Sequence, residues 1–211
     1  MKNLILRGLV VGPVSTNCYF LKHNDTDEMI IVDPGAEPER IINAVQQLSG
    51  HPVGILLTHG HYDHMCAANE LRSHYQIPIY AAKEEEHLLL DTTENLSAAW
   101  SGKPYTVKAD VYVDHGEKLE LAGFFVKTLL TPGHTTGSCC YWIEEEGVCL
   151  SGDTLFYGSC GRTDLPTGSM RSMRQSLKEL LETLPENTEI YPGHGEATDA
   201  AFEKLHNPYL L

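Results

Sequence analysis

One short segment, THGHYDH at residues 58–64, constrains this chain more than any other part of its sequence. It follows the apolar run 53–57, which predicts a buried strand, so its polar side chains stand at a strand end. Four of them can bind a metal ion through nitrogen or oxygen: His59, His61, Asp63 and His64. The first two histidines are two residues apart and can reach one ion, whereas the aspartate and the last histidine open a predicted helix. Their different direction suits a second ion close to the first.

Three further strand ends carry the same kind of polar residue. Apolar runs in the second half of the chain lead into Pro132-Gly133-His134, Ser151-Gly152-Asp153 and Pro192-Gly193-His194. The glycine before each one lets the backbone turn sharply and approach its neighbours closely. A single histidine or aspartate in such a turn is more often a local hydrogen-bonding residue. Together with the first cluster, however, they predict one cleft with seven donors: His59, His61, Asp63, His64, His134, Asp153 and His194.

Seven donors exceed the four that surround a tetrahedral zinc ion, and they fit two divalent ions that share a carboxylate and a water. Nitrogen and oxygen donors without a thiolate suit zinc, iron or manganese. We expect zinc first, with iron and manganese as the alternatives. A non-catalytic binding module is disfavoured, because structural metal sites normally have four ligands and no open position.

Length and charge limit the classes of protein and partner. We expect the chain to form one domain that spans residues 1–211. A net charge of -14 without a basic stripe opposes binding to a phosphate backbone, so nucleic acid is not an expected partner. The N-terminus lacks a signal-peptide pattern and no window is apolar enough to span a bilayer, which predicts a soluble, cytoplasmic protein without a membrane partner. The six cysteines contain no C-x-x-C pair and are expected to be reduced, mostly buried thiols.

Hydrophobic periodicity predicts an α+β fold, with two sheets packed together and helices on the outside. Strands are expected at residues 4–11, 17–22, 29–32, 53–57, 77–80, 118–121, 124–130, 138–143, 148–151 and 189–191. Helices are expected at residues 37–49, 64–75, 84–90, 170–184 and 198–205. The acidic run 84–86 is expected to be the solvated first turn of its helix. The segment 91–110 is expected to be either a wall or lid of the site or a loop packed on its own aromatic residues.

The segment 58–64 matches the pattern T-H-x-H-x-D-H, and the later histidines and aspartate follow in the matching order. In these respects the chain resembles the metallo-β-lactamase fold superfamily over essentially its whole length. The resemblance implies an αββα sandwich of two mixed β-sheets with outer helices. The ligand groups that it implies are His59, His61 and His134 for one ion, Asp63, His64 and His194 for the other, and Asp153 bridging both.

Within that superfamily, the stretch from Gly152 to Arg162 resembles the glyoxalase II group. In those enzymes a basic residue at the position of Arg162 holds a carboxylate of glutathione. The alternative for this arginine is a surface ion pair with Asp164. Tyr157 is a further candidate to line the cleft and bind substrate. Because only a short segment follows His194, we expect no extra helical domain like that of the larger members, and the chain is similar to the compact, single-domain hydroxyacylglutathione hydrolase type.

These observations predict a metal-dependent hydrolase that acts on a small-molecule thioester, such as S-lactoylglutathione or another acyl thiol. Two divalent ions lower the pKa of a shared water toward about 7, and the hydroxide attacks the thioester carbonyl. Asp63 and Asp153 are the expected catalytic carboxylates, the first orienting the water and the second bridging the ions. The alternative is a persulfide dioxygenase, which by resemblance holds one iron on His59, His134 and Asp153. A β-lactamase is disfavoured because the bridging position holds an aspartate and no secretion signal is present, and RNA processing is disfavoured by the charge.

Overall fold

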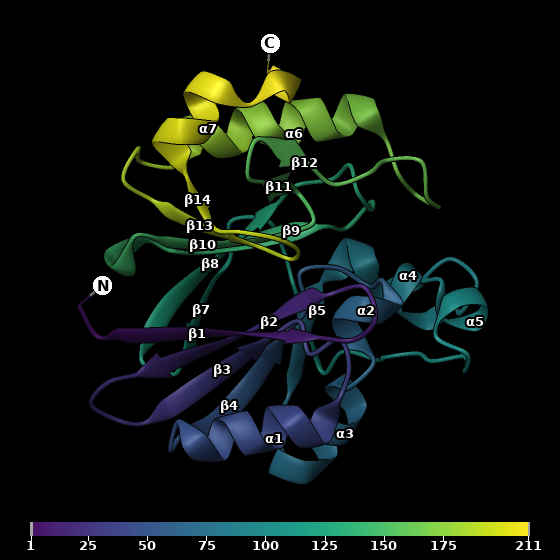
Figure 1. Ribbon diagram of the computed structural model, residues 1–211, viewed down its shortest axis with the longest axis vertical. Helices are drawn as coiled ribbons and strands as arrows, with labels where there is room; N and C mark the ends of the chain where they lie inside the picture. The colour runs from purple at the N-terminus through teal and green to yellow at the C-terminus, as the bar shows by residue number, and fades with distance from the viewer. Residues whose placement is uncertain (1, 211) are drawn as a thin grey trace.

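The computed structural model describes residues 2–210, and within that range the chain forms two six-stranded β-sheets that pack face to face (Figure 1). The first sheet has the strand order β1-β2-β3-β4-β5-β6. Its strands are β1 (Leu4–Val11), β2 (Thr16–His23), β3 (Glu28–Val32), β4 (His51–Leu56), β5 (Ile79–Ala82) and β6 (Val111–Val113). Strands β1 to β3 are antiparallel because short turns join them, whereas β3 to β6 run parallel, so the sheet is mixed.

The second sheet has the strand order β14-β13-β10-β9-β8-β7. Its strands are β7 (Lys118–Leu121), β8 (Phe124–Leu130), β9 (Cys139–Ile143), β10 (Val148–Gly152), β13 (Glu189–Pro192) and β14 (Thr198–Asp199). Strands β10 and β13 are parallel, and α6 (Met170–Thr183) lies in the connection between them. Together with α7 (Ala200–His206), α6 covers the outer face of this sheet (Figure 1). A short hairpin of β11 (Leu155–Phe156) and β12 (Ser159–Cys160) follows β10.

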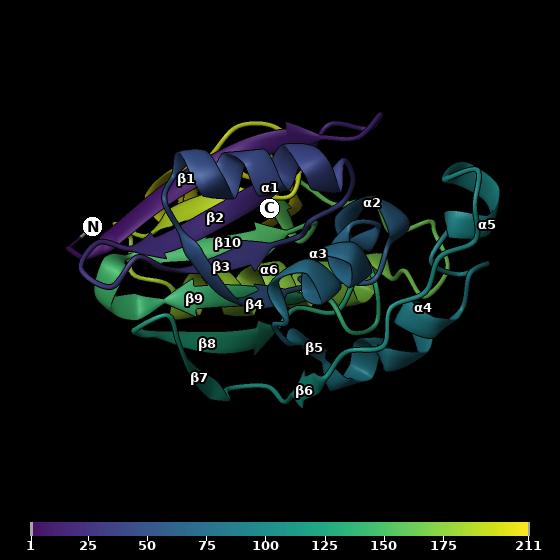
Figure 2. The same ribbon diagram turned by 90° about the horizontal axis from the view of Figure 1, so that it is seen from below.

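Helices α1 (Pro38–Gln47) and α3 (Ala68–Tyr75) cover the outer face of the first sheet, which Figure 2 shows from below. Buried Ile41 and Val45 are four residues apart in α1, so they lie on one face of the helix. They belong to one apolar cluster with Leu71 of α3 and Ile55 of β4. Burial of these side chains fixes the helices on the sheet.

A second apolar cluster fills the space between the two sheets. Leu21 and Leu56 point inward from the first sheet and meet Val126, Tyr141 and Leu150 from the second. Each of these side chains is at most 1% exposed. Burial of apolar surface contributes about 25 cal/mol per Å², so this layer is the main force that holds the sheets together. The edge of the sandwich, where strands end, is left to carry polar side chains.

The expected α+β sandwich of two mixed sheets with outer helices is confirmed. The helix expected at residues 64–75 is interrupted and forms α2 (Tyr62–Met65) and α3. The break arises because the amide of Ala67 donates to the carbonyl of Pro34 (2.9 Å), outside the helix. Residues Lys83–Glu85 form a 3-10 turn before α4 (Glu86–Leu90), and the segment 91–110 contains α5 (Ser97–Trp100).

Further 3-10 turns cover Glu144–Glu146 and Pro208–Leu210. Among residues 2–210, no helix combines the length and the apolar character that a membrane crossing requires.

Candidate metal centre

All seven predicted donors meet at one edge of the sandwich, where strand ends from both sheets face each other. The first sheet contributes four of them, two in the loop after β4 and two in α2. The second sheet contributes one after β8, one after β10 and one after β13. The structure therefore brings together side chains that are up to 135 positions apart in sequence, from His59 to His194 (194 − 59 = 135).

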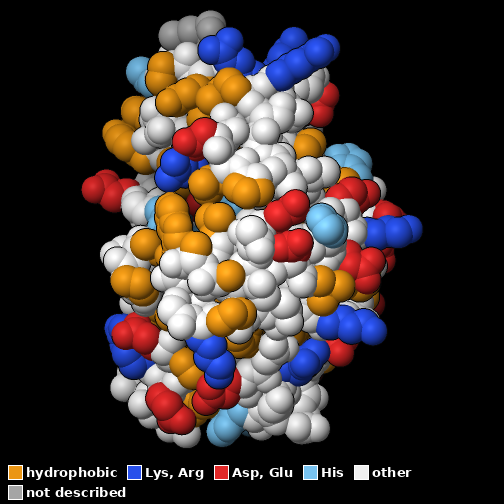
Figure 3. Space-filling model, turned by 90° about the vertical axis from the view of Figure 1, so that its right-hand side faces the viewer, with side chains coloured by type: hydrophobic (Ala, Val, Ile, Leu, Met, Phe, Trp, Pro, Cys, Tyr) orange, Lys and Arg blue, Asp and Glu red, His pale blue; other side chains and the backbone are white. Residues whose placement is uncertain are grey.

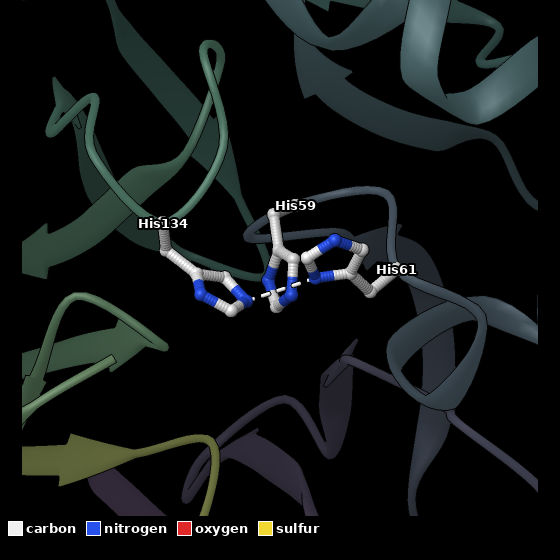
Figure 4. A group of neighbouring side chains, drawn as sticks. All are labelled: His59, His61 and His134. Atoms are coloured by element: carbon white, nitrogen blue, oxygen red, sulfur yellow. Dashed lines mark hydrogen bonds between the residues drawn. The ribbon is translucent and has the colours of Figure 1, made fainter. Parts of the chain in front are cut away.

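Three histidines form the first group, which Figure 4 shows with the rings turned toward a common point. Nδ1 of His61 lies 2.8 Å from Nε2 of His134. The ring of His59 stands edge-on to both, with ring centroids 4.9 Å from His61 and 4.8 Å from His134. The three side chains are at most 3% exposed. Three buried nitrogens converging in this way suit one metal ion.

Asp63, His64 and His194 form the second group. Nε2 of His194 lies 3.3 Å from Oδ2 of Asp63 and 3.4 Å from Nε2 of His64. His64 is fully buried, whereas the His194 side chain is 27% exposed. The second group therefore stands closer to solvent than the first.

Asp153 lies between the two groups. Its Oδ1 is 3.4 Å from Nε2 of His64, and its Oδ2 is 3.4 Å from Nε2 of His134 and 3.6 Å from Nε2 of His194. The backbone makes room for this carboxylate at Gly193, where a Cβ atom would lie only 2.3 Å from Oδ1 of Asp153. The arrangement matches two ion positions that share one carboxylate.

Hydrogen bonds from outside the two groups orient their side chains. Nδ1 of His64 faces Oδ2 of Asp33 at 3.0 Å, and Nδ1 of His134 faces the carbonyl of Arg162 at 2.7 Å. Both contacts leave Nε2 directed into the centre, as is usual for histidines that bind metals. The hydroxyl of Thr16 donates to Oδ2 of Asp63 at 2.8 Å.

The sequence prediction omits Asp33, although its carboxylate is the main support of the first loop. It accepts hydrogen bonds from the amide (2.8 Å) and the hydroxyl (2.7 Å) of Thr58, and it is 2% exposed. A signal for it is present in the sequence. Asp33 follows β3, which pairs in parallel with β4, and the carboxyl ends of parallel strands lie at the same edge of a sheet.

Glu85 corrects the expectation that the acidic run 84–86 is solvated. Its side chain is 1% exposed and accepts three hydrogen bonds: from the Gly60 amide (2.8 Å), the Thr135 hydroxyl (3.0 Å) and the Gly137 amide (2.8 Å). Burial raises the pKa of Glu85 to about 6, and these three bonds oppose the rise. The carboxylate thus joins the loop of His59 and His61 to the loop that follows His134.

Charges within the centre separate the histidines into two kinds. Burial, together with the neighbouring His64, lowers the pKa of His59 far below its usual value, and burial with His134 lowers the pKa of His61 to about 3. Burial also disfavours a charged His64, yet the carboxylates of Asp63, Asp153 and Asp33 raise its pKa to about 10. The first group therefore offers neutral nitrogens, the protonation state in which histidine binds a metal.

Buried polar atoms without a partner test whether a metal fits these residues. Among the described residues, Nε2 of His59 and Oδ1 of Asp153 are buried and have no hydrogen-bond partner. Burying such atoms unpaired is costly, and a divalent cation at the centre would satisfy both. The donor set also contains the nitrogen and oxygen ligands that zinc, iron and manganese accept. The residues present therefore fit a divalent metal site.

The sequence profile of the Metallo-beta-lactamase superfamily matches residues 11–194 of this chain, a range that includes all seven donors. The chain belongs to the metallo-β-lactamase superfamily. Among curated relatives, the probable metallo-hydrolase YqgX of Bacillus subtilis is 39% identical over 97% of this chain and 96% of its own length. The hydroxyacylglutathione hydrolase GloC of Haemophilus influenzae is 34% identical and covers 92% of each chain.

Solved structures of the superfamily superpose closely on this fold. The BLEG-1 B3 metallo-β-lactamase has a TM-score of 0.92, with 38% identity over 98% of this chain and 99% of its own. TTHA1623, solved in a di-iron-bound form, has a TM-score of 0.84, with 33% identity over 97% of this chain and 100% of its own. ETHE1 from Myxococcus xanthus has a TM-score of 0.81, with 29% identity over 97% of this chain and 83% of its own.

A cavity of about 440 Å³ opens beside the two groups, on the side of the molecule shown in Figure 3. Such a volume suits a small-molecule site. Hydrophobic side chains gather on this face left of centre, at the height where the sheets meet (Figure 3). Besides the metal-centre residues, the cavity is lined by Val14, Tyr62, Leu96, Trp100, Phe156, Ser159, Cys160, Arg162 and Leu165. Trp100 and Leu96 come from the segment 91–110, which therefore forms a wall of the cavity and also packs on its own aromatic Tyr105 through Asn95 and Ser97.

The two predicted substrate-binding residues lie differently with respect to this cavity. Arg162 lines it, but its Nε and Nη2 bind the carboxylate of Asp164 at 2.7 and 2.8 Å, the ion pair that was the alternative for this arginine. Tyr157 is 54% exposed and stacks on Phe202 instead of lining the cavity, where Phe156 takes the corresponding place. Cys160 also lines the cavity. Burial raises the pKa of its side chain to about 11, so the side chain is a protonated thiol at neutral pH.

Proposed function

We propose that this chain is a dinuclear metal-dependent hydrolase that cleaves a small-molecule thioester, either S-lactoylglutathione or a related acyl thiol. The observation that carries the proposal is the position of Asp153, whose two oxygens face the two groups of donors. Similarity to the hydroxyacylglutathione hydrolase GloC over most of both chains supports the substrate class. We also propose that the protein acts in the cytoplasm and has no nucleic-acid or membrane partner, as its charge and sequence suggest.

Two bound divalent ions would supply an ionised water at neutral pH and a positive charge for the oxygen of the attacked carbonyl. The chain's residues provide the remaining requirements. Asp63 is held by the hydroxyl of Thr16, and in this proposal its carboxylate would orient a water next to the second group. The half-open cavity admits a substrate beside His134 and His194. A thiolate leaving group has a pKa of about 8.5 and departs without a general acid.

The metal itself is proposed to be zinc, with iron and manganese as alternatives. The residues alone do not separate these ions, since all three accept nitrogen and oxygen ligands. The similar structure of TTHA1623 contains two irons, which supports a pair of ions in a site of this kind.

Metal analysis combined with thioester hydrolysis tests the proposal directly. Purified protein is expected to contain about two divalent ions per chain and to release thiol from S-lactoylglutathione or a simple acyl thioester. Asp153→Ala removes the carboxylate between the groups, so it is expected to lower metal content below two per chain and to reduce hydrolysis by about 10²-fold or more. A variant that retains both ions and full activity would contradict the dinuclear assignment.

A persulfide dioxygenase with one iron is the second candidate, and the structural similarity to ETHE1 keeps it in consideration. Its implied ligands, His59, His134 and Asp153, are all present in the centre. Oxygen uptake with a persulfide, at one iron per chain and without thiol release from thioesters, would replace our first proposal by this one. Because the BLEG-1 structure is named as a β-lactamase, a chromogenic β-lactam belongs in the same assay; we expect its hydrolysis to be far slower than that of thioesters.

A further inference from the structure

One wall of the cavity is apolar and is built from separate parts of the chain. Leu96 and Trp100 come from the segment that contains α5, and Phe156 comes from β11. Val14 of the turn between β1 and β2 and Leu165 of the loop after β12 complete it. We propose that this wall selects thioesters that carry an uncharged, apolar group next to the scissile bond. This inference rests on the proposed thioester hydrolysis and narrows its substrate class.

The backbone at Leu96 shows that the wall is held in place. Leu96 has φ 68° and ψ 2°, a left-handed conformation that a leucine rarely adopts. Such strain persists only where the surroundings fix the backbone, and it gathers at functional sites. The amide of Trp100 donates to the carbonyl of Leu96 at 2.9 Å, so the strained residue also anchors α5.

Asn95 connects this strained residue directly to the metal loop. It is fully buried, and its carbonyl accepts a hydrogen bond from the amide of Tyr62 at 2.9 Å. Its side chain accepts from the Ser97 amide at 2.9 Å and donates to the Tyr105 carbonyl at 3.0 Å. Because Tyr62 lies between His61 and Asp63, the apolar wall has a fixed position relative to both donor groups.

The charges around the cavity disfavour an anionic substrate group. Among the described residues that line it, Arg162 is the one lysine or arginine, and Asp164 already occupies two of its nitrogens. A carrier such as glutathione has two carboxylates, and each loses hydration on burial unless a cation or hydrogen-bond donors replace it. An apolar group needs none, and it gains from contact with Leu96, Trp100 and Phe156.

A series of thioesters tests this inference with the metal-loaded enzyme. Acetyl, butyryl and hexanoyl esters of neutral N-acetylcysteamine are compared with the same acyl groups on glutathione, and with acetyl esters of alkyl thiols of increasing length. We expect kcat/KM to rise by up to about fourfold for each added methylene group in one of the two length series. Dependence on the acyl length places the apolar group on the acyl side, and dependence on the thiol length places it on the carrier side. We expect the neutral carrier to exceed glutathione.

Two variants connect the preference to the wall. Leu96→Asn removes the apolar side chain but keeps a residue that tolerates the left-handed conformation, so the fold is expected to be retained. In this variant kcat/KM should no longer rise with the length of the apolar group. The same result is expected for Trp100→Ala. The control Leu90→Asn changes a leucine that is 46% exposed and does not line the cavity, and it should keep the wild-type series.

The outcomes separate this inference from the proposed function. The wild-type enzyme could hydrolyse thioesters with no dependence on length in either series, or it could prefer the glutathione carrier. Either result would overturn the inference about the apolar wall and leave the proposed thioester hydrolysis intact. The same holds if Leu96→Asn and Trp100→Ala both retain the wild-type slope. If no thioester is hydrolysed by the metal-loaded protein, the proposed function itself fails.

Discussion

Replacing Glu85 with glutamine is expected to weaken metal binding by the first group while leaving the free energy of unfolding almost unchanged. The carboxylate of Glu85 joins Gly60, between the first two histidines, to Thr135 and Gly137, just after His134. Glutamine has nearly the same shape, but one of its two oxygens is replaced by an NH₂ group. In either orientation the NH₂ group faces a peptide N–H, that of Gly60 or that of Gly137, and this N–H loses its acceptor.

The magnitudes follow from the structure. With a pKa of about 6 instead of 4.5, the buried charge of Glu85 costs about 2 kcal/mol at neutral pH, and glutamine removes this cost. A buried donor left without an acceptor costs about 1–3 kcal/mol, so the two effects largely cancel. These two effects cancel in the free energy of unfolding but not in the metal affinity. The metal affinity depends on how firmly the two loops hold their histidines. Loss of such supporting contacts lowers metal affinity by about 10- to 100-fold.

Competition with a chromogenic chelator measures the affinity of each donor group for zinc. Chemical denaturation of the metal-free protein measures the free energy of unfolding. Glu85→Gln is expected to lose affinity for one ion, that of the first group, and to keep the other. The matched control is Glu84→Gln, one position earlier on the same 3-10 turn but exposed, which should behave as wild type. Wild-type affinity for both ions in Glu85→Gln, or an equal loss in Glu84→Gln, would refute the role assigned to this carboxylate.

Three further outcomes are expected. Since the folded pKa of Glu85 lies above its ordinary value, its contribution to stability is present below about pH 4.5 and is lost as the pH rises through about 6; denaturation at several pH values should show wild type losing about 2 kcal/mol relative to Glu85→Gln across this window, and a constant difference would contradict it. Gly193→Ala places a Cβ atom 2.3 Å from Oδ1 of Asp153, so elemental analysis should find a metal content well below that of wild type. An unchanged metal content would show that the backbone shifts at little cost and would contradict this prediction. Thr16→Val removes the 2.8 Å hydrogen bond to Asp63 at nearly constant shape, and titration should show about tenfold weaker binding of the ion at the second group only; equal weakening of both ions would indicate a general loosening.

The seven donors could be predicted to converge because each follows a strand, and strand ends meet at the edges of sheets. The residue before His134, Asp153 and His194 is in each case a glycine, and the structure explains this at Gly193, where a side chain would collide with Asp153. The glycine before each donor thus indicated, from local sequence, that the backbone approaches its neighbours closely at these positions. The sandwich of two mixed sheets followed from the superfamily resemblance, whereas the order of the strands within each sheet was not predicted and is a finding of the structure.

Glu85 could not be predicted in the same way. Within the sequence it is the middle of three glutamates, in a position where a solvated helical turn accounts for all of them. Its burial is decided by Gly60 and Gly137, which are distant in the chain and have no local pattern that points to a carboxylate. The same applies to the break after α2, which depends on the carbonyl of Pro34. Local periodicity contains no information about such partners.

Thr16, which donates a hydrogen bond to Asp63, also joins the beginning of the fold to its end. Thr16, in the second strand, forms a bridge with His194, and the amide of Asn17 donates to the carbonyl of Gly193 at 2.7 Å. Closing a loop of this length carries an entropic cost that grows slowly with the length of the loop. The group of Asp63, His64 and His194 is therefore complete only when β13 is paired in its sheet and lies against β2. If the centre holds two ions as proposed, occupancy of both positions therefore requires that the whole sandwich is assembled.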